Sequence, residues 1–420
     1  MRGSLPWLRI GWRNLGRNPK RTAITASGLA VGYFAVVFMA GWSGGIVDEL
    51  IDNGTSLVSG QIEVHDAGYR PERNLHDTIG GHGGVDVGLL LQRIESDPAV
   101  TVAAPRAYAG ALIGSGDSTA AGVLMGVVPD RETAVSRFLD RLAEGRLPRA
   151  GSRELVVGEE MARQLGVAVG DEIVLVAPGA DGSIANDLYT LAGVFRTGLV
   201  AFDTAFVVMP LADLQLLVVL DPARIHEIAA ATVNPKAAEA AALRLAESVG
   251  DIDPAVAVAP WSELKPLIVD YVGLVEGAYW IILVIVFTVA VFGVANTMLM
   301  ATFERRREFA VILALGATPR SIMGAVLSES VAIGVLSLAA GAALALPLMV
   351  WWHNAPPSLA WLYGNTSMGG VLLTPSLRVA YDPEAWLWAA VALLLTALVA
   401  ALYPAVRAAR TPPADTLSGL

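Results

Sequence analysis

Four long apolar stretches, at residues 22–44, 272–300, 322–350 and 385–404, are arranged around one large polar block. A helix needs about 20 apolar residues to cross a bilayer, and the last stretch reaches that length when Tyr403 and Pro404 extend it. The polar block, residues 45–271, separates the first stretch from the second and is long enough to fold as a domain. The chain is therefore predicted to be an integral membrane protein with four transmembrane helices and a large mixed α/β domain between helices 1 and 2.

The composition agrees with residence in a membrane. Charged residues make up 16% of the chain, against about 25% in average soluble domains, and the mean hydropathy is +0.55. The first apolar stretch is longer than the core of about 7–15 residues in a cleaved signal peptide, so we expect it to be retained. The sequence has no cysteine, which excludes disulfides and thiolate metal sites.

Basic residues flank the apolar stretches unevenly. They gather in residues 1–21, in residues 301–321 and in residues 405–420, whereas residues 351–384 contain only Arg378. The positive-inside rule then makes those three basic segments cytoplasmic and the block 45–271 and the loop 351–384 extracytoplasmic, in the cytoplasmic (inner) membrane. The chain has a net charge of −10 because the outer block is strongly acidic, and nothing in this distribution favours a nucleic-acid partner. Within the first basic segment, residues 5–21 alternate tryptophans with arginines and are predicted to form an amphipathic helix on the membrane surface.

The outer block alternates predicted strands with short predicted helices, which is typical of packed α/β layers. Residues 61–65, 100–113 and 120–128 are expected to be strands, and residues 89–96 and 131–143 helices. A second series follows, with strands at 154–157, 172–177, 188–195 and 205–209 and helices at 159–165 and 211–218. Residues 225–258 are expected to return to the first series, so that residues 153–220 form an inserted subdomain.

The sequence offers no catalytic or metal site. None of its three lysines follows a glycine, so the chain has no G-x-x-x-x-G-K-[ST] loop with which to hold nucleotide phosphates. His65, His76 and His82 lie near two aspartates, but their spacing fits no helix or strand face, and we predict no metal site there. Glu329 is an isolated charge in the third apolar stretch, and we expect it to face the helix bundle or the cytoplasmic surface rather than to relay protons.

The most informative motif joins the second and third apolar stretches. Residues 296–322 read NTMLMATFERRREFAVILALGATPRSI, and the second span is predicted to continue without a break into a charged helix over 303–315. Gly316 permits a turn, Thr318 can cap the next helix, and Pro319 suits the first position of that helix. A charged helix at this place can transmit a push from a cytoplasmic partner to the membrane helices.

This segment resembles the permease family of ABC transporters that includes the lipoprotein-releasing (LolC/LolE-type), macrolide-exporter (MacB-type) and cell-division (FtsX-type) proteins. The carboxy-terminal residues 403–417, YPAVRAARTPPADTL, are similar to the closing signature of that family. The resemblance implies that the connection is the coupling element that docks on a separate ATPase. The residues that carry this implied role are Glu304, Arg305, Arg306, Arg307, Glu308, Leu315, Gly316, Ala317 and Pro319.

Two stretches of the outer block look most like the lipoprotein-releasing branch. They are GQIEVHDAGY at residues 60–69 and VFRTGLVAFDTAFVVMPLADLQLL at residues 194–217. A third stretch, residues 154–176, is shared more widely in the family and does not distinguish its branches. The resemblance also implies that residues 45–271 form a MacB-like periplasmic core domain.

The implied function is that of a non-catalytic permease subunit that binds no cofactor itself. It would form a homodimer or heterodimer and work with P-loop ABC ATPase subunits that bind ATP and Mg²⁺. Hydrolysis would move the outer domains by mechanotransmission, with lipoprotein release or transport as the expected task. The sequence leaves open export of a peptide, drug or lipid, with or without a periplasmic adaptor, a scaffold that activates a cell-wall hydrolase, and a sensor without an ATPase.

Overall fold

The structure is a computed structural model that describes residues 19–81, 85–359, 361, 366–368, 371–373 and 376–418. The amphipathic helix predicted over residues 5–21 falls outside this part of the chain, apart from residues 19–21, which begin a longer helix. The chain divides into two compact units. Unit 1 contains residues 1–48, 273–362 and 375–420, and unit 2 contains residues 49–272 and 363–374.

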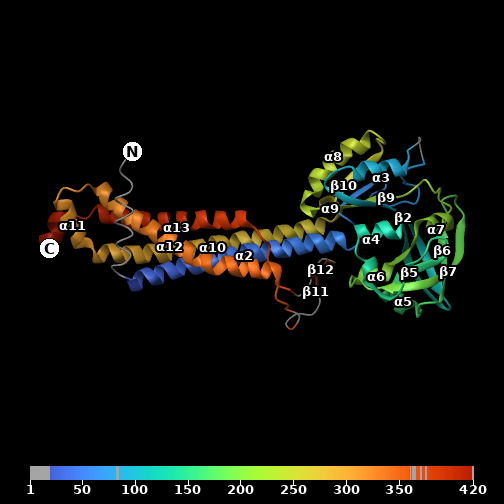
Figure 1. Cartoon of the computed structure of the whole chain (residues 1–420), viewed down its shortest axis with the longest axis horizontal. Coiled ribbons are helices and arrows are strands. Elements are labelled where there is room, and N and C mark those ends of the chain that lie inside the picture. Colours follow the sequence, from blue (N-terminus) through green and yellow to red (C-terminus); the bar gives the residue numbers. More distant parts are fainter. Residues whose placement is uncertain are drawn as a thin grey trace. The chain divides into compact units, whose positions relative to one another are not determined.

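Four helices are long and apolar enough to cross a membrane: α2 (Pro19–Ser56), α10 (Pro266–Glu304), α12 (Pro319–Asn354) and α13 (Pro383–Ala409). Together with the α/β architecture of unit 2, they confirm the predicted fold class (Figure 1). All four helices extend beyond the apolar stretches in the sequence, because backbone hydrogen bonds continue a helix past the point where its apolar side chains end. Helix α13 includes Pro404 and continues into the segment predicted to be a tail.

Small residues allow the helices of unit 1 to pack closely, as is usual where no hydrophobic effect drives association within lipid. A Cβ added at Gly341 of α12 would lie 2.8 Å from the backbone oxygen of Ala30 in α2. The hydroxyl of Ser330 donates to the backbone oxygen of Ala397 in α13 at 2.6 Å. Helix α10 differs from the other three, since 6% of its most apolar window is buried, against 33–39% in the others. Its apolar surface is therefore left for lipid or for another chain.

Unit 1 also contains two short helices, α11 (Arg306–Ala314) and α14 (Pro413–Ser418), which pack against each other. Between α12 and α13, where the sequence predicts a loop, the strands β11 (Thr366–Met368) and β12 (Val371–Leu373) form a small hairpin.

Unit 2 begins with a sheet in which strands from both ends of the block lie side by side. Strand β1 (Ile62–Asp66) pairs with β10 (Val256–Pro260) on one edge and with β9 (Glu227–Thr232) on the other. The first half of β2 (Val100–Ser115) completes this part, and α3 (Val87–Glu95) and α8 (Ala238–Gly250) lie together beside it (Figure 1). The predicted return of residues 225–258 to the first series of strands is confirmed.

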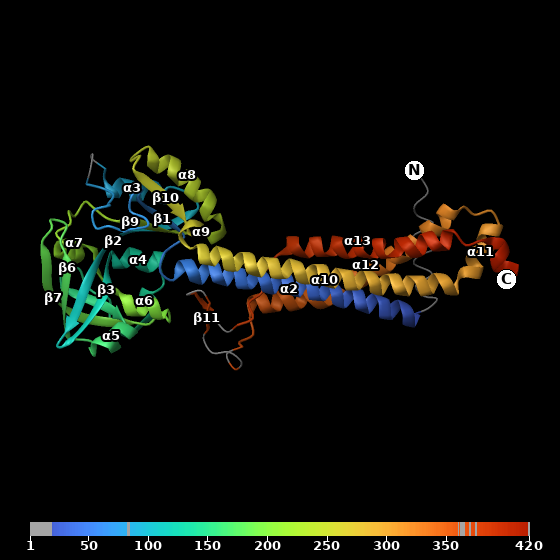
Figure 2. The ribbon, with the colours of Figure 1, turned by 180° about the vertical axis from the view of Figure 1, so that it is seen from behind.

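The second half of β2 belongs to a closed ring of strands. It pairs with β3 (Ser118–Val127), and the ring continues through β8 (Phe206–Pro210), β5 (Glu154–Gly158), β7 (Ile184–Phe195) and β6 (Glu172–Pro178). The ring closes because β6 pairs with β2. Ring closure of this kind leaves no edge and encloses a core. In Figure 2 these strands gather at the end of unit 2 away from α3 and α8.

Residues 153–220 therefore do not form a separate inserted subdomain with a core of their own. The core inside the ring combines Ile113 and Leu124 of the β2–β3 hairpin with Leu155, Ile173 and Val207 of the later strands. Helices α5 (Glu159–Leu165) and α7 (Leu211–Leu217) contribute to the same core. Residues 153–220 are an insertion along the chain, but their strands complete the ring only by pairing with β2 and β3.

One prediction of local structure was wrong, and one helix was missed. Residues 131–143 form only the short helix α4 (Pro129–Val135), followed by the 3₁₀ turn Leu139–Arg141 and by strand β4 (Leu142–Gly145), which pairs with β7. The helical pattern is overridden by this pairing, a common outcome when a short segment can complete a sheet. The short helix α6 (Val200–Ala205) was not predicted, and its Phe202 packs with Phe138 and Phe195.

A substitution at Gly158 tests how tightly β5 packs against α6. A Cβ added at this position would lie 2.1 Å from the backbone oxygen of Asp203, so Gly158→Ala requires the backbone to move. Overpacking of a tight core typically costs about 1–3 kcal/mol, and we expect a loss of at least that size in pulse proteolysis of the purified full chain. Gly110→Ala is the matched control, since an added Cβ there meets nothing within 4 Å. Equal midpoints for the two variants would show that this contact is looser than described.

Candidate functional site

The connection between α10 and α12 contains all of the residues to which the resemblance gives a coupling role. Helix α10 ends at Glu304, Arg305 departs from helical geometry with φ −99° and ψ 13°, and α11 begins at Arg306. The predicted uninterrupted helix over 303–315 is thus wrong at one residue. The reason lies in the contacts of Arg305, whose side chain turns back toward α12.

Ion pairs fix Arg305 at the base of α11. Its Nη1 lies 2.8 Å from Oε2 of Glu329 in α12, and its Nε lies 3.2 Å from Oε2 of Glu308. Arg21 of α2 approaches the same carboxylate, with Nη2 3.8 Å from Oε1 of Glu329, and its Nη1 lies 2.9 Å from Oε2 of Glu304. Glu329 is only 5% exposed, so these pairs are poorly screened by water. The carboxylate faces the bundle, as expected, and it joins α2, α12 and the start of α11.

Backbone hydrogen bonds then fix the end of α11 and the start of α12. Gly316 has φ +94°, and the N–H groups of Gly316 and Ala317 donate to the carbonyls of Leu313 and Ile312. This is the Schellman pattern, for which glycine is the favoured residue. Thr318 Oγ1 accepts from the N–H of Ser321, and Pro319 occupies the first turn of α12. The capping predicted from the sequence is confirmed.

The side chains of the connection divide into inward and outward groups. Arg305 and Ala317 are half-buried, whereas Arg306, Arg307, Gly316 and Pro319 are exposed. Leu315 is 83% exposed, and two apolar residues that the sequence reasoning missed, Val311 and Ile312, are also exposed on α11. The spacing of Val311, Ile312 and Leu315 at i, i+1 and i+4 is the signal that places them on neighbouring parts of one helix surface. An exposed apolar cluster beside two exposed arginines, Arg306 and Arg307, is typical of a surface that another protein covers.

The outer unit contains a second candidate site that sequence reasoning did not find. Arg106 of β2 is 1% exposed and uses all five of its N–H groups. Its Nε lies 3.0 Å from Oε2 of Glu132, and its Nη1 lies 3.1 Å from Oε1 of Glu227, whose other neighbour is the hydroxyl of Tyr108 at 2.6 Å. Its Nη2 donates to the backbone oxygen of Val58 at 2.9 Å.

Arg106 therefore holds the linker that leads from α2 into β1. Both Val58 and Ser59 lie in that linker, and both give their carbonyl oxygens to the guanidinium. No motif marks Arg106, because its partners are far apart in the sequence and only the pairing of β2 with β9 brings Glu227 beside it.

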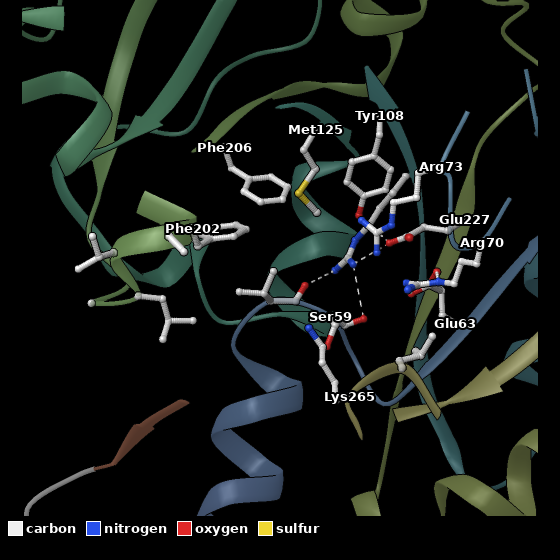
Figure 3. Close-up of a pocket in the computed structure, with 17 residues that line it drawn as sticks. Ser59, Glu63, Arg70, Arg73, Tyr108, Met125, Phe202, Phe206, Glu227 and Lys265 are labelled. Atoms are coloured by element: carbon white, nitrogen blue, oxygen red, sulfur yellow. Dashed lines mark hydrogen bonds and ion pairs between the residues drawn. The ribbon is translucent and has the colours of Figure 1, made fainter. Parts of the chain in front are cut away.

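A cavity of about 510 Å³ lies beside Arg106. Figure 3 shows Phe202, Phe206 and Met125 on one side of it and the charged side chains of Glu63, Arg70, Arg73 and Glu227 on the other. We call this cavity the Arg106 pocket. Its complete lining is Val58, Ser59, Glu63, Arg70, Arg73, Arg106, Tyr108, Met125, Gly198, Leu199, Val200, Ala201, Phe202, Phe206, Glu227, Leu264 and Lys265.

Burial and mutual repulsion shift the titration of the charged wall. Burial raises the pKa of Glu63 to about 7, with a further rise from the neighbouring Glu227, although Arg70 donates two hydrogen bonds to its carboxylate. The pKa of Glu227 is lowered, since Arg106 and Tyr108 oppose the effect of its burial. The pKa of Lys265 is lowered because its ammonium is buried.

Three of the histidines have ring nitrogens in contact with backbone atoms. His82 falls outside the described residues, and no group of three metal-ligating side chains occurs within the described part of the chain. His65 contacts the backbone oxygen of Asp66. His226 accepts from the N–H of Tyr108 through Nδ1, so its Nε2 carries the proton that faces the oxygen of Leu75. His353 contacts the backbone oxygen of Val379.

Arg106→Met tests how far the linker depends on the buried guanidinium. The substitution leaves Glu132 and Glu227 buried without their common partner, and breaking such a pair typically costs about 3–5 kcal/mol. We expect a loss of this size in the stability of the outer unit, together with faster hydrogen exchange at residues 57–61, measured on the full chain by mass spectrometry. Arg93→Met, at an exposed arginine of α3, is the control and should change neither. Unchanged exchange in Arg106→Met would contradict the assigned role.

Glu63 predicts a dependence of stability on pH. Its pKa in the folded protein, about 7, exceeds the value of about 4.3 for an unfolded chain, so the folded state binds its proton more tightly. The protonated Glu63 carboxyl therefore stabilises the folded state fully below about pH 4.3, and this contribution is lost as pH rises from there through 7. Glu63→Gln lacks this titration. The difference between its unfolding midpoint and that of the wild type should therefore shift in favour of the variant from pH 5 to pH 8. A difference that does not change with pH would refute the raised pKa.

Two protein-family models match this chain. The model of the MacB-like periplasmic core domain matches residues 22–248, which is more than half of the chain, and the model of the FtsX-like permease C-terminal region matches residues 280–413.

Among individual proteins, the lipoprotein-releasing system transmembrane protein LolC of Neisseria meningitidis is 24% identical over 98% of this chain and 97% of its own length. The LolE protein of Haemophilus influenzae is 24% identical over 78% of this chain and 80% of its own. The periplasmic region of MacB from Actinobacillus actinomycetemcomitans aligns with 51% of this chain and 94% of its own, at 13% identity and a TM-score of 0.36. The chain belongs to the FtsX/MacB/LolC-LolE-like family of ABC transporter permeases.

Proposed function

We propose that this permease couples ATP hydrolysis by a separate ABC ATPase to movement of its extracytoplasmic unit, and that this movement releases a lipoprotein from the membrane. The observation that carries the proposal is the α10–α12 connection. It presents Arg306, Arg307 and Leu315 outward while Arg305 and Glu329 hold its base. A partner that pushes on this surface acts directly on the ends of α10 and α12.

The direction of the push follows from the orientation that the basic residues predict. Both termini and the connection lie in the cytoplasm, where ATP is available, and the unit that contains the Arg106 pocket lies outside. The chain has no phosphate-binding loop of its own, so ATP and Mg²⁺ are bound by the ATPase subunit. The permease itself carries out no covalent chemistry.

A second permease copy, identical or related, completes the complex. Support comes from α10, whose apolar surface is almost unburied and exposes Trp280, Ile281 and Phe292 among other residues. Helices that expose apolar surface inside a bilayer contact either lipid or another helix. Two permeases provide one coupling connection for each of two ATPase subunits.

Lipoprotein release is favoured by the relatives that match this chain along most of its length. The Neisseria meningitidis and Haemophilus influenzae proteins are both named as parts of lipoprotein-releasing systems. The test is affinity purification of the chain from its native membranes, followed by mass spectrometry of the proteins that co-purify. A P-loop ATPase together with acylated lipoproteins supports the proposal. An ATPase with an export adaptor or a cell-wall hydrolase would replace the proposed cargo, and the absence of any ATPase would overturn the coupling.

The coupling surface predicts the effect of a charge reversal. Arg306→Glu combined with Arg307→Glu should reduce the stimulation of ATP hydrolysis at least tenfold, because the outward-facing charges change sign while Arg305 keeps its pairs with Glu308 and Glu329. The readout is ATPase activity of the complex reconstituted in nanodiscs. Arg93→Glu in the outer unit is the matched control. A double variant that hydrolyses ATP like the control would remove these arginines from the docking surface.

A further inference from the structure

The Arg106 pocket contains more positive charge than its own carboxylates neutralise. Its lining contributes four cations, Arg70, Arg73, Arg106 and Lys265, and two carboxylates, Glu63 and Glu227. Glu132, which bonds Arg106 from behind the wall, adds a third carboxylate. A buried site with surplus positive charge is a site where an anion gains stabilisation.

Two of the four cations are already used by the protein. Arg106 is saturated by two carboxylates and two backbone oxygens, and Arg70 forms a bidentate pair with Glu63. These pairs serve the fold, since they hold the linker after α2 and the first strand. Through these pairs, Glu63 and Glu227 each already have an arginine partner within the protein.

The other two cations act on Glu63 and Glu227 only through space and form no hydrogen-bonded ion pair with described residues. Among the described residues, the Lys265 ammonium forms no hydrogen bond or ion pair, and the Arg73 guanidinium contacts only the ring of Tyr108, at 6.0 Å from its centroid. Figure 3 shows the side chain of Lys265 directed into the pocket from the chain segment that precedes α10. An unpaired ammonium in a half-buried position is costly, and the lowered pKa of Lys265 reflects that cost.

The wall opposite the charges is apolar. The rings of Phe202 and Phe206 stack with centroids 4.3 Å apart, and Met125, Leu199 and Leu264 continue this surface. Aromatic and thioether side chains adapt to apolar groups of different shape. A cavity of this volume, with an apolar wall and a few convergent polar groups, is typical of sites for small molecules.

We propose that the Arg106 pocket binds a small amphiphile, with its carboxylate or phosphate group between Lys265 and Arg73 and its apolar body against Phe202 and Phe206. The pocket touches the linker after α2 through Val58 and Ser59, and it touches the segment before α10 through Leu264 and Lys265. A bound molecule therefore contacts both the linker that follows α2 and the segment that leads into α10. Its occupancy is set by chemistry within one unit and does not depend on any role of the permease in ATP hydrolysis.

The experiment is calorimetric titration of the full chain in nanodiscs, with empty nanodiscs as the reference. The probes are octyl phosphate and octanoate, which carry both parts of the proposed ligand, and octanol and inorganic phosphate, which carry one part each. We expect saturable binding of at least one octyl anion in a 1:1 ratio, at least tenfold tighter than either single-part probe. The stronger of the two octyl anions identifies the preferred acid group. Equal binding of octanol or of inorganic phosphate would overturn the proposal, as would no saturable binding.

Two variants separate recognition from folding. Lys265→Met keeps the length of the side chain and removes an unpaired charge, so it should weaken the octyl anion at least tenfold without lowering the stability of the outer unit. Phe206→Ala shortens the apolar wall and should weaken the octyl anion while leaving inorganic phosphate unchanged. Arg93→Gln is the control and should bind as the wild type does. Wild-type affinity in Lys265→Met would overturn the proposal even if the amphiphile binds elsewhere.

Discussion

The buried guanidinium of Arg106 is the interaction on which the order of the outer unit depends. It joins β2, where it originates, to Glu132 of α4, to Glu227 of β9 and to the linker that enters β1. Such a cluster adds little net stability compared with a well-packed apolar core, but removing one member leaves buried charge without a partner. In this arrangement all five N–H groups of the guanidinium have acceptors, and two of those acceptors are backbone oxygens of the linker. The end of α2 is thereby attached to the sheet at a defined place.

Unit 1 uses the same device with different residues. Glu329 is buried in α12, and it pairs with Arg305 from the α10–α12 connection and with Arg21 from the start of α2. One carboxylate thus attaches the base of α11 to two helices. The cation–π contact of Arg305 with Phe309, at 5.2 Å, orients the same side chain further. The break in the helix occurs at the residue that makes these contacts, Arg305.

The sequence predicts the four apolar helices, most strands and the caps at Gly316 and Thr318, because each depends on local periodicity or on a few adjacent residues. It does not predict the ring of strands in unit 2, whose closure requires three residues of β6 to pair with β2 across a long insertion. It also misses the Arg106 pocket, for Arg106, Glu132, Glu227 and Lys265 are ordinary residues until the fold brings them together. Glu329 is recognisable as unusual, but nothing in the sequence pairs it with Arg305, which the resemblance places in the coupling element.

The pairing of β1 with β10 determines how the outer unit can respond to its two chain connections. The chain enters β1 from α2 and leaves β10 toward α10, and the partners Ile62 and Pro260 lie at that same end of the two antiparallel strands. Spreading the two connections apart would load the bonds of Val58 and Ser59 to Arg106 and then this residue pair, and it would peel the strands open from that end. Sliding one connection lengthwise past the other would instead shear the whole ladder at once, and a ladder resists shear far better than peeling. The outer unit should thus resist sliding of the two connections more than their spreading. Its strands should therefore respond most strongly when α2 and α10 move apart.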